Sequence, residues 1–316
     1  MIRKDLSVTS NIAKLLKHLN TLEKLQHGKV TPIMVHAMLT HRCQLNCVHC
    51  CFKNRQNKKA DIKLEVFIEA MRWFRELGTK SIELTGGGDP VLYPQVNTVL
   101  RYLKQNKWHI GVITNGLGGS LVDHWEWFDW VRVSLNTLDY QDDLELGYLN
   151  GIPTSFCYIW NENSPKRIGR VIDYANEKQT ICRLAPDCIM PTWLIEKQLD
   201  SIRETMSRYP DNEYVFLSDF NIQTKRKNHN CYIHMIKPCF YIDGWVYSCP
   251  SAELAYENDK QIQNKTRICR YDKIYEFYTS DKAIQHKSHD CSYCKYVDQQ
   301  ELLEALLAET EFNEFA

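Results

Sequence analysis

The chain has 316 residues, of which 44% are hydrophobic, and its 39 Lys and Arg balance 39 Asp and Glu. This length suits one large or two modest domains. No stretch approaches the roughly 18 unbroken apolar residues of a membrane span, and the N-terminus lacks the apolar core of a signal peptide. We therefore expect a cytoplasmic protein without a membrane partner. The zero net charge also argues against nucleic acid as a partner.

The chain contains 13 cysteines. In a protein that is not exported, so many cysteines argue against a disulfide framework and favour metal binding in a reducing compartment. The cysteine motifs are therefore the first place to look for function.

The hydrophobic pattern alternates between strands and helices from residue 33 onward. In chain order it predicts strand Ile33–Thr40, helix Leu64–Leu77, strand Ser81–Thr85, helix Val96–Lys104, strand His109–Thr114, a short helix near Leu121–Trp125, strands Trp130–Asn136 and Thr154–Trp160, helix Lys166–Glu177, strand Thr180–Ala185 and helix Pro191–Arg208. Repeated βα units predict a parallel sheet with crossover helices. In such a fold, catalytic groups lie at the carboxyl ends of the strands.

Three cysteines, Cys43, Cys47 and Cys50, follow the first predicted strand with the spacing C-x₃-C-x₂-C. Thiolates are the usual protein ligands of iron–sulfur clusters. A [4Fe–4S] cluster has four irons, so three ligands leave one iron open, as in a catalytic metal site. Taken alone, the motif also fits a zinc knuckle or a chance group of cysteines.

Polar and glycine residues follow the next strands. The second strand runs into Gly86-Gly87-Gly88-Asp89-Pro90, and consecutive glycines let the backbone approach a ligand because no Cβ intervenes. The third strand ends at Asn115, and the fourth ends at Ser134 and Asn136. Each of these ends could also be an ordinary turn.

A second set of cysteines lies in the C-terminal third. Its members are Cys231, Cys239, Cys249, Cys291 and Cys294. Cys231 and Cys249 frame Gly244 as C-x₁₂-G-x₄-C, and the last two form C-x₂-C, after which no cysteine follows. The set supplies five candidates for the four places of one site, and a tetrahedral zinc site is the alternative.

Together these motifs resemble the radical SAM superfamily, and the second cysteine set resembles its SPASM and twitch extensions. The resemblance implies a partial (β/α)₆ TIM-like barrel with a C-terminal twitch extension that binds one auxiliary [4Fe–4S] cluster. It also implies that the open iron of the first cluster binds S-adenosyl-L-methionine (SAM) and that the reduced cluster cleaves SAM to a 5′-deoxyadenosyl radical.

The resemblance also implies roles for single residues. Gly87, Gly88 and Asp89 match the segment that holds the amino group of the methionine moiety. Asn115 lies in a TNG turn that is frequent in the family, while Ser134 and Asn136 match positions that contact the ribose or carboxylate of SAM. Arg183, in the sixth strand, is expected to face the barrel mouth and bind the SAM carboxylate or the substrate. For the auxiliary cluster we favour Cys231, Cys249, Cys291 and Cys294, with Cys239 as the substitute.

The same resemblance gives a domain division. We expect a basic N-terminal extension at 1–30, the radical SAM barrel at 31–210, the twitch domain at 211–296 and an acidic C-terminal helix or tail at 297–316. The boundary near 210 rests on Pro210-Asp211-Asn212, which breaks the alternating pattern.

The predicted function is a radical SAM oxidoreductase. We expect it to dehydrogenate a small biosynthetic intermediate or to modify a peptide oxidatively, with an electron donor such as flavodoxin or ferredoxin. Modification of a nucleotide or nucleic acid is the first alternative, because basic runs such as Lys225-Arg226-Lys227 lie near the cysteine sets. A non-catalytic Fe–S electron-transfer or zinc-binding interaction protein is the second.

Overall fold

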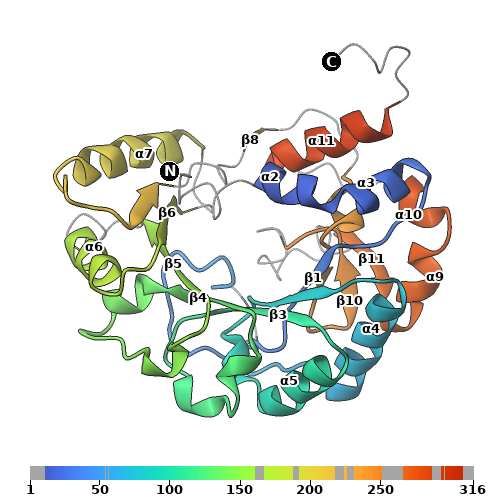
Figure 1. Cartoon of the computed structure of the whole chain (residues 1–316), viewed down its shortest axis with the longest axis horizontal. Helices are drawn as coiled ribbons and strands as arrows, with labels where there is room; N and C mark the ends of the chain where they lie inside the picture. The colour runs from blue at the N-terminus through green and yellow to red at the C-terminus, as the bar shows by residue number, and fades with distance from the viewer. Residues whose placement is uncertain are drawn as a thin grey trace.

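A computed structural model of the chain (Figure 1) describes most of its length. The described residues are 11–53, 55, 57–160, 167–187, 192–217, 224–225, 231–250, 266–286, 293–294 and 296–308.

Ten strands of the described chain form one curved sheet, in the order β11-β10-β9-β1-β2-β3-β4-β5-β6-β7. Its central strands, all parallel, are β1 (Met34–Ala37), β2 (Ser81–Leu84), β3 (His109–Thr114), β4 (Trp130–Ser134), β5 (Thr154–Trp160), β6 (Cys182–Pro186) and β7 (Val215–Leu217). This arrangement confirms the predicted α/β fold with a partial barrel of parallel strands.

Four longer helices cover the outside of the barrel (Figure 1). They are α4 (Leu64–Glu76), α5 (Val96–Gln105), α6 (Ile168–Glu177) and α7 (Thr192–Met206). In α4, Phe67, Ala70, Met71 and Phe74 are all buried, as expected of a helix with one apolar face against a sheet. Apart from β7, which the sequence did not predict, these helices and strands agree with the predicted ones to within a few residues at each end.

The short helix expected near Leu121–Trp125 is different. The chain there forms two turns of 3₁₀ helix, η3 (Gly119–Leu121) and η4 (Trp125–Trp127). Other 3₁₀ turns are η2 (Pro90–Leu92), η5 (Leu135–Asp139), η6 (Gly147–Leu149), η8 (Ile233–Met235) and η10 (Tyr271–Lys273). The chain between β3 and β4 therefore crosses over without a full α-helix.

The C-terminal segments extend the barrel sheet directly. Strand β9 (Cys239–Phe240) pairs in parallel with β1, and β10 (Trp245–Tyr247) and β11 (Arg267–Arg270) continue the sheet as antiparallel strands. Helices α9 (Ile274–Tyr278) and α10 (Lys282–Gln285) follow, and β8 (Thr224–Lys225) pairs separately with β12 (Tyr293–Cys294). Strand β7 begins after residue 210 and pairs with β6, so the division into domains stays a prediction.

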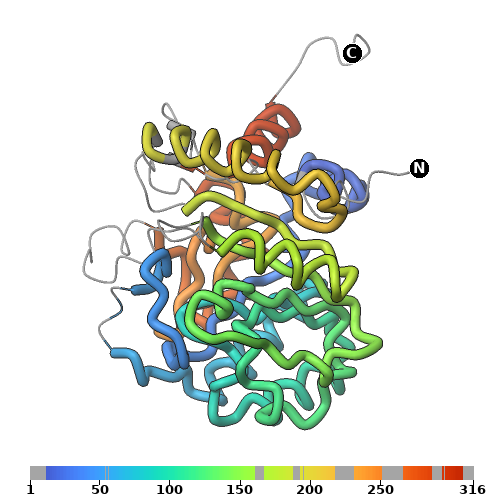
Figure 2. The backbone as a smooth tube through the Cα atoms, turned by 90° about the vertical axis from the view of Figure 1, so that its left-hand side faces the viewer, coloured from blue at the N-terminus to red at the C-terminus, as the bar shows by residue number. Residues whose placement is uncertain are grey.

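Helices near the two ends of the chain pack together beside the sheet (Figures 1 and 2). They are α2 (Asn11–Leu15), η1 (Leu16–His18), α3 (Leu19–Gln26) and α11 (Val297–Leu307). Leu22 and Leu25 of α3 and Leu303 of α11 are buried, so the N-terminal segment forms part of the core. No helix in the described residues is long and apolar enough to cross a bilayer.

Candidate active site

The three cysteines of the first motif lie on the loop that follows β1, at the carboxyl end of the barrel strands. Each thiol is partly buried. Burial raises the pKa of the Cys43 thiol, and it raises the pKa of the Cys47 thiol to about 11, with Cys50 and Cys43 adding to the shift. The thiols are therefore close enough to influence one another, and a bound cation would be needed to favour their thiolate forms.

Polar groups surround these thiols. Asn115 Nδ2 donates a hydrogen bond to Cys43 Sγ over 3.7 Å, and Tyr140 lies near Cys47, where it opposes the rise in the pKa of that thiol. Hydrogen bonds to ligating sulfurs tune the potential of thiolate-bound clusters, so this donor set suits an iron–sulfur cluster. No three His, Cys, Asp or Glu side chains of the described residues converge to hold a single metal ion.

The start of the cysteine loop is anchored by charged side chains. Thr40 Oγ1 donates to Asp61 Oδ1 over 2.6 Å, and the Arg42 guanidinium forms a bidentate pair with the same carboxylate at 2.8 and 3.0 Å. Buried Arg55 donates to the His41 carbonyl over 2.9 Å. A bidentate Arg–carboxylate pair fixes geometry well, so these contacts hold the backbone that leads into Cys43.

The glycine turn packs directly against this backbone. Gly88 N donates to Thr40 O and Asp89 N donates to Arg42 O, each over 2.7 Å. A Cβ on Gly88 would lie 2.0 Å from Arg42 O, and one on Gly87, whose φ is +70°, would lie 2.7 Å from Thr40 O. The absent Cβ atoms leave room for the cysteine loop, and a role of Gly87 and Gly88 toward SAM stays a prediction.

Residues at the end of β3 donate hydrogen bonds to the Asp89 side chain. Its carboxylate, which is 3% exposed, accepts hydrogen bonds from Asn115 N at 2.7 Å, Thr114 Oγ1 at 2.9 Å and Val91 N at 3.2 Å. Burial raises the pKa of the Asp89 carboxyl, and the three donors oppose this shift. Asp89 thus joins the glycine turn to the TNG turn, and a role toward SAM stays a prediction.

The other residues expected to bind SAM differ in whether their polar side-chain groups remain available to a ligand. The Asn136 side chain is fully buried: its Nδ2 donates to Ile159 O at 2.9 Å and Asp139 Oδ2 at 3.2 Å, and its Oδ1 accepts from Ile159 N at 2.8 Å. Asn136 therefore joins β4 to β5 through its own amide. Ser134 makes only a long contact of 3.4 Å to Asn136 Oδ1, so its hydroxyl is more available to a ligand.

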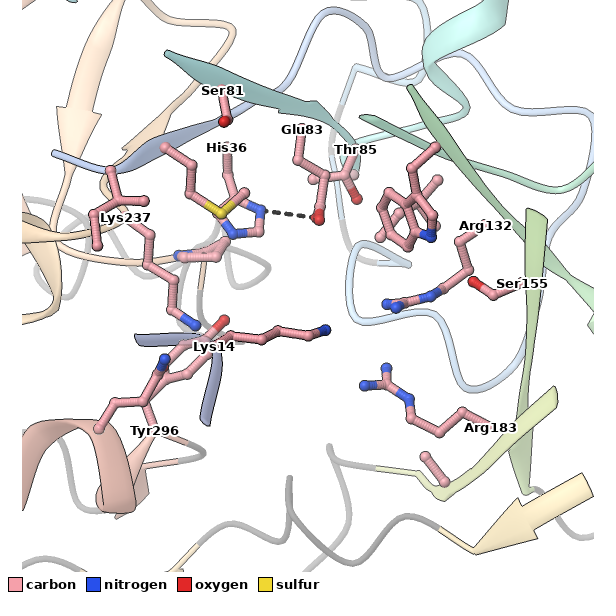
Figure 3. A pocket seen from close by; sticks show the side chains of 18 of the residues that line it. Lys14, His36, Ser81, Glu83, Thr85, Arg132, Ser155, Arg183, Lys237 and Tyr296 are labelled. Carbon is pink, nitrogen blue, oxygen red and sulfur yellow. Dashed lines mark ion pairs between the residues drawn. The ribbon is translucent and has the colours of Figure 1, made fainter. Parts of the chain in front are cut away.

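A cavity of about 1040 Å³ lies inside the barrel, and several charged and polar side chains stand among the apolar residues that line it (Figure 3). His36 Nδ1 lies 3.0 Å from Glu83 Oε1. Burial alone would raise the pKa of the Glu83 carboxyl, but His36 and then Arg132 outweigh it and lower the pKa to about 2. Arg183 faces this cavity from β6 and Lys14 enters it from α2.

Sequence reasoning missed most of these cavity residues. His36, Glu83, Arg132 and Ser155 alternate with apolar residues along their strands, and period-two alternation places such side chains on one face. The register aligns His36 with Glu83 and Arg132 with Ser155. A charged residue within a strand of otherwise apolar residues could therefore have been used to predict these cavity side chains.

The auxiliary candidates are only partly within the described residues, because Cys291 lies outside them. Cys231 and Cys239 are buried, while Cys249 and Cys294 are partly exposed. Cys231, Cys249 and Cys294 belong to or pack against the main hydrophobic core. Cys239 packs instead in a small apolar group beside the first cysteine loop, formed with Met38, Phe52, Tyr241 and Tyr247. The ligand set stays a prediction.

Comparisons with known proteins identify a family for the central part of the chain. Residues 38–182, which contain the first cysteine motif and the glycine turn, match the Radical SAM superfamily. The subtilosin biosynthesis protein AlbA of Bacillus subtilis is 31% identical over 87 residues, 27% of this chain and 19% of AlbA. The S-adenosylmethionine-dependent nucleotide dehydratase of a Thermoplasmatales archaeon is 24% identical over 116 residues, 34% of this chain and 38% of the relative. The chain thus spans well under half of these curated relatives.

Solved structures share the fold. SuiB of Streptococcus suis, bound to its precursor peptide SuiA, superposes with a TM-score of 0.59 at 14% identity, covering 88% of this chain and 72% of SuiB. The enzyme anSMEcpe, with bound AdoMet and a Cp18Cys peptide, gives 0.51 at 14% identity, covering 90% of this chain and 86% of its own. The sequence motif, the barrel around it and the family match lead to one conclusion: residues 38–182 form a radical SAM domain.

Proposed function

We propose that Cys43, Cys47 and Cys50 would hold a [4Fe–4S] cluster with SAM bound to it. With one electron supplied by a reduced donor protein such as flavodoxin or ferredoxin, this group would cleave SAM to methionine and a 5′-deoxyadenosyl radical, which would take a hydrogen atom from a substrate C–H bond. The observation that carries this proposal is the meeting of three segments at one end of the barrel. The cysteine loop, the glycine turn and the TNG turn are joined there by the Gly88–Thr40, Asp89–Asn115 and Asn115–Cys43 hydrogen bonds.

The protein's own groups have separate tasks in this proposal. Asn115 donates a hydrogen bond to the Cys43 sulfur, and Tyr140 opposes the rise in the pKa of the Cys47 thiol, so both residues favour the thiolate forms. Gly87 and Ser134 border the place where we expect SAM, with backbone and hydroxyl groups respectively. The barrel strands line the cavity on several sides, and exclusion of water from it would protect a reactive intermediate.

We propose an oxidative outcome for the substrate, either dehydrogenation of a small molecule or oxidative modification of a peptide. The peptide option is supported by the peptides named with SuiB and anSMEcpe, which share this fold. The small-molecule option is supported by the polar cavity inside the barrel. Modification of a nucleotide is the second candidate, favoured by the positive side chains of that cavity and by the nucleotide dehydratase among the relatives.

Iron content tests the proposed cluster sites. Anaerobic reconstitution should give about eight irons per chain, as two [4Fe–4S] clusters require. Changing Cys43, Cys47 and Cys50 together to Ala should leave about four irons and abolish 5′-deoxyadenosine formation. Cys182→Ala is the matched control, because Cys182 is a buried core residue of β6, and its iron content should equal that of the wild type. Zinc in place of iron, or SAM cleavage by the triple variant, would refute the proposal.

We also propose that Cys231, Cys249, Cys291 and Cys294 bind an auxiliary cluster. Cys231→Ala should lower iron to about four per chain while SAM cleavage persists, because the first cluster has its own ligands. Cys239→Ala should keep all its iron, since Cys239 packs in a different apolar group from the other described candidates. If Cys239→Ala loses iron and Cys231→Ala does not, Cys239 is the ligand instead.

A further inference from the structure

Among the buried polar atoms of the cavity lining that have no hydrogen-bond partner in the described part of the chain, three lie on adjacent strands. They are Arg132 Nε, Arg183 Nε and Ser155 Oγ, each with almost no surface exposed to solvent. They come from three adjacent strands, β4, β5 and β6, and Figure 3 shows both guanidinium groups directed into the same space. Buried donors normally have hydrogen-bond partners, so three orphans in one cavity indicate that a ligand supplies the acceptors.

The same cavity concentrates positive charge. Lys14 extends from α2 toward the two arginines (Figure 3). Burial lowers the pKa of the Lys14 ammonium, and the charges of Arg132 and Arg183 lower it further. Burial and then Arg183 lower the pKa of Arg132. The three cations therefore feel one another's charge inside the barrel.

The negatively charged side chain of the cavity is already paired with a histidine. Glu83 is the one acidic side chain among the described residues that line the cavity, and it lies 3.0 Å from His36 Nδ1. The Arg132 guanidinium stacks over the Trp130 ring at 4.6 Å, which offsets part of the cost of its burial. Burying several cations around one carboxylate is still unfavourable unless a further anion compensates them. The guanidinium fork matches the oxygens of phosphate and carboxylate groups in particular.

We infer that Arg132, Arg183 and Lys14, together with the Ser155 hydroxyl, bind the phosphate or carboxylate group of a small-molecule substrate inside the barrel. The inference deepens the proposed function and rests on it. This assigns Arg183 to substrate binding. Arg132, which the sequence did not single out, binds the same anionic group of the substrate.

The position of this anion site suits a substrate whose opposite end lies near the glycine turn and the cysteine loop. The cavity extends toward the carboxyl ends of the strands. Thr85, Gly86 and Cys51 line it there, beside the glycine turn and the cysteine loop. Glu83, which lines the same cavity as the arginines, precedes Gly86 by three residues, which corresponds to about 10 Å along a strand. A molecule of this length can bind its anion at Arg132 and present a C–H bond near the turn.

Anion binding to the reconstituted enzyme with SAM tests the inference. The probes are inorganic phosphate and, separately, acetate, titrated by calorimetry at low ionic strength, where charge screening is weak. Wild-type enzyme should bind at least one of them, and that anion should raise its unfolding temperature. Tighter binding of phosphate would indicate a phosphorylated substrate, and tighter binding of acetate would indicate a carboxylate.

The variants are Arg132→Gln and Arg183→Gln, with Arg101→Gln as the matched control on the exposed face of α5. Each cavity variant should weaken anion binding at least tenfold, and the control should bind as the wild type does. Arg132→Lys keeps the charge and should retain part of the affinity, which gives a second test if Arg132→Gln folds poorly.

Two outcomes would overturn the inference. One is wild-type enzyme that cleaves SAM but binds neither anion, and the other is equal anion affinity in Arg132→Gln and wild type. A short acidic peptide that binds when neither small anion does would transfer the site to peptide substrates. Absence of SAM cleavage by the wild type would count instead against the proposed radical chemistry, since 5′-deoxyadenosine is measured in the same preparation.

Discussion

Gly88→Ala should prevent assembly of the first cluster. The new Cβ would lie 2.0 Å from Arg42 O and 2.5 Å from the His41 carbonyl carbon, far inside van der Waals contact, and both neighbours are backbone atoms that no rotamer change can move. Gly88 N is also hydrogen-bonded to Thr40 O over 2.7 Å. Relief of the overlap must therefore displace the segment that carries Cys43. Iron content should fall from about eight to about four per chain, and SAM cleavage should be lost.

Gly147→Ala is the matched control for this substitution. Gly147 begins η6, and a Cβ there would meet no atom within 4 Å. The control should keep full iron content and SAM cleavage. Full iron in Gly88→Ala together with weak SAM binding would show that the glycine turn meets only the ligand, as the sequence alone suggested.

The fold could be predicted from the sequence because its signals are local. Buried parallel strands are short apolar runs, and helices such as α4 repeat apolar residues with the helical period. Strand β9 carries no such signal, since it has two residues and pairs with β1 about 200 positions earlier. Pairing of that kind depends on the finished barrel edge, so the sequence could suggest a C-terminal unit but not its continuity with the sheet.

The sequence predicts the cluster ligands, but it does not predict the residues that hold the ligand loop in place. Spacing identifies Cys43, Cys47 and Cys50, because one cluster needs several thiolates on a short loop. The Asp61–Arg42 pair that anchors the loop has no such spacing, since it depends on how two loops meet in space. Arg183 was singled out as a charge inside a strand. The same reasoning applied to Arg132, two residues before Ser134 in β4, would have found the second guanidinium.

Asp89→Asn should reduce the free energy of unfolding by about 3 kcal/mol, because hydrogen bonds to a charged group contribute roughly 1.5–3 kcal/mol each. In the native protein the carboxylate accepts from Asn115 N, Thr114 Oγ1 and Val91 N in a site that is 3% exposed. An amide replaces one acceptor oxygen with an NH₂ donor, which then faces another donor. At least one buried N–H or O–H loses its acceptor, and the TNG turn is no longer fixed against the glycine turn.

Chemical denaturation of the wild type, Asp89→Asn and Asp173→Asn measures this effect. Asp173 is exposed on α6, so its substitution should change stability by no more than about 0.5 kcal/mol. A carboxylate that only held the amino group of SAM would give the opposite pattern, with unchanged stability and weaker SAM binding. Because its acceptor oxygens are already used by Thr114 and Asn115, we expect the loss of stability and a loosened Asn115, which would also weaken the hydrogen bond to Cys43 Sγ.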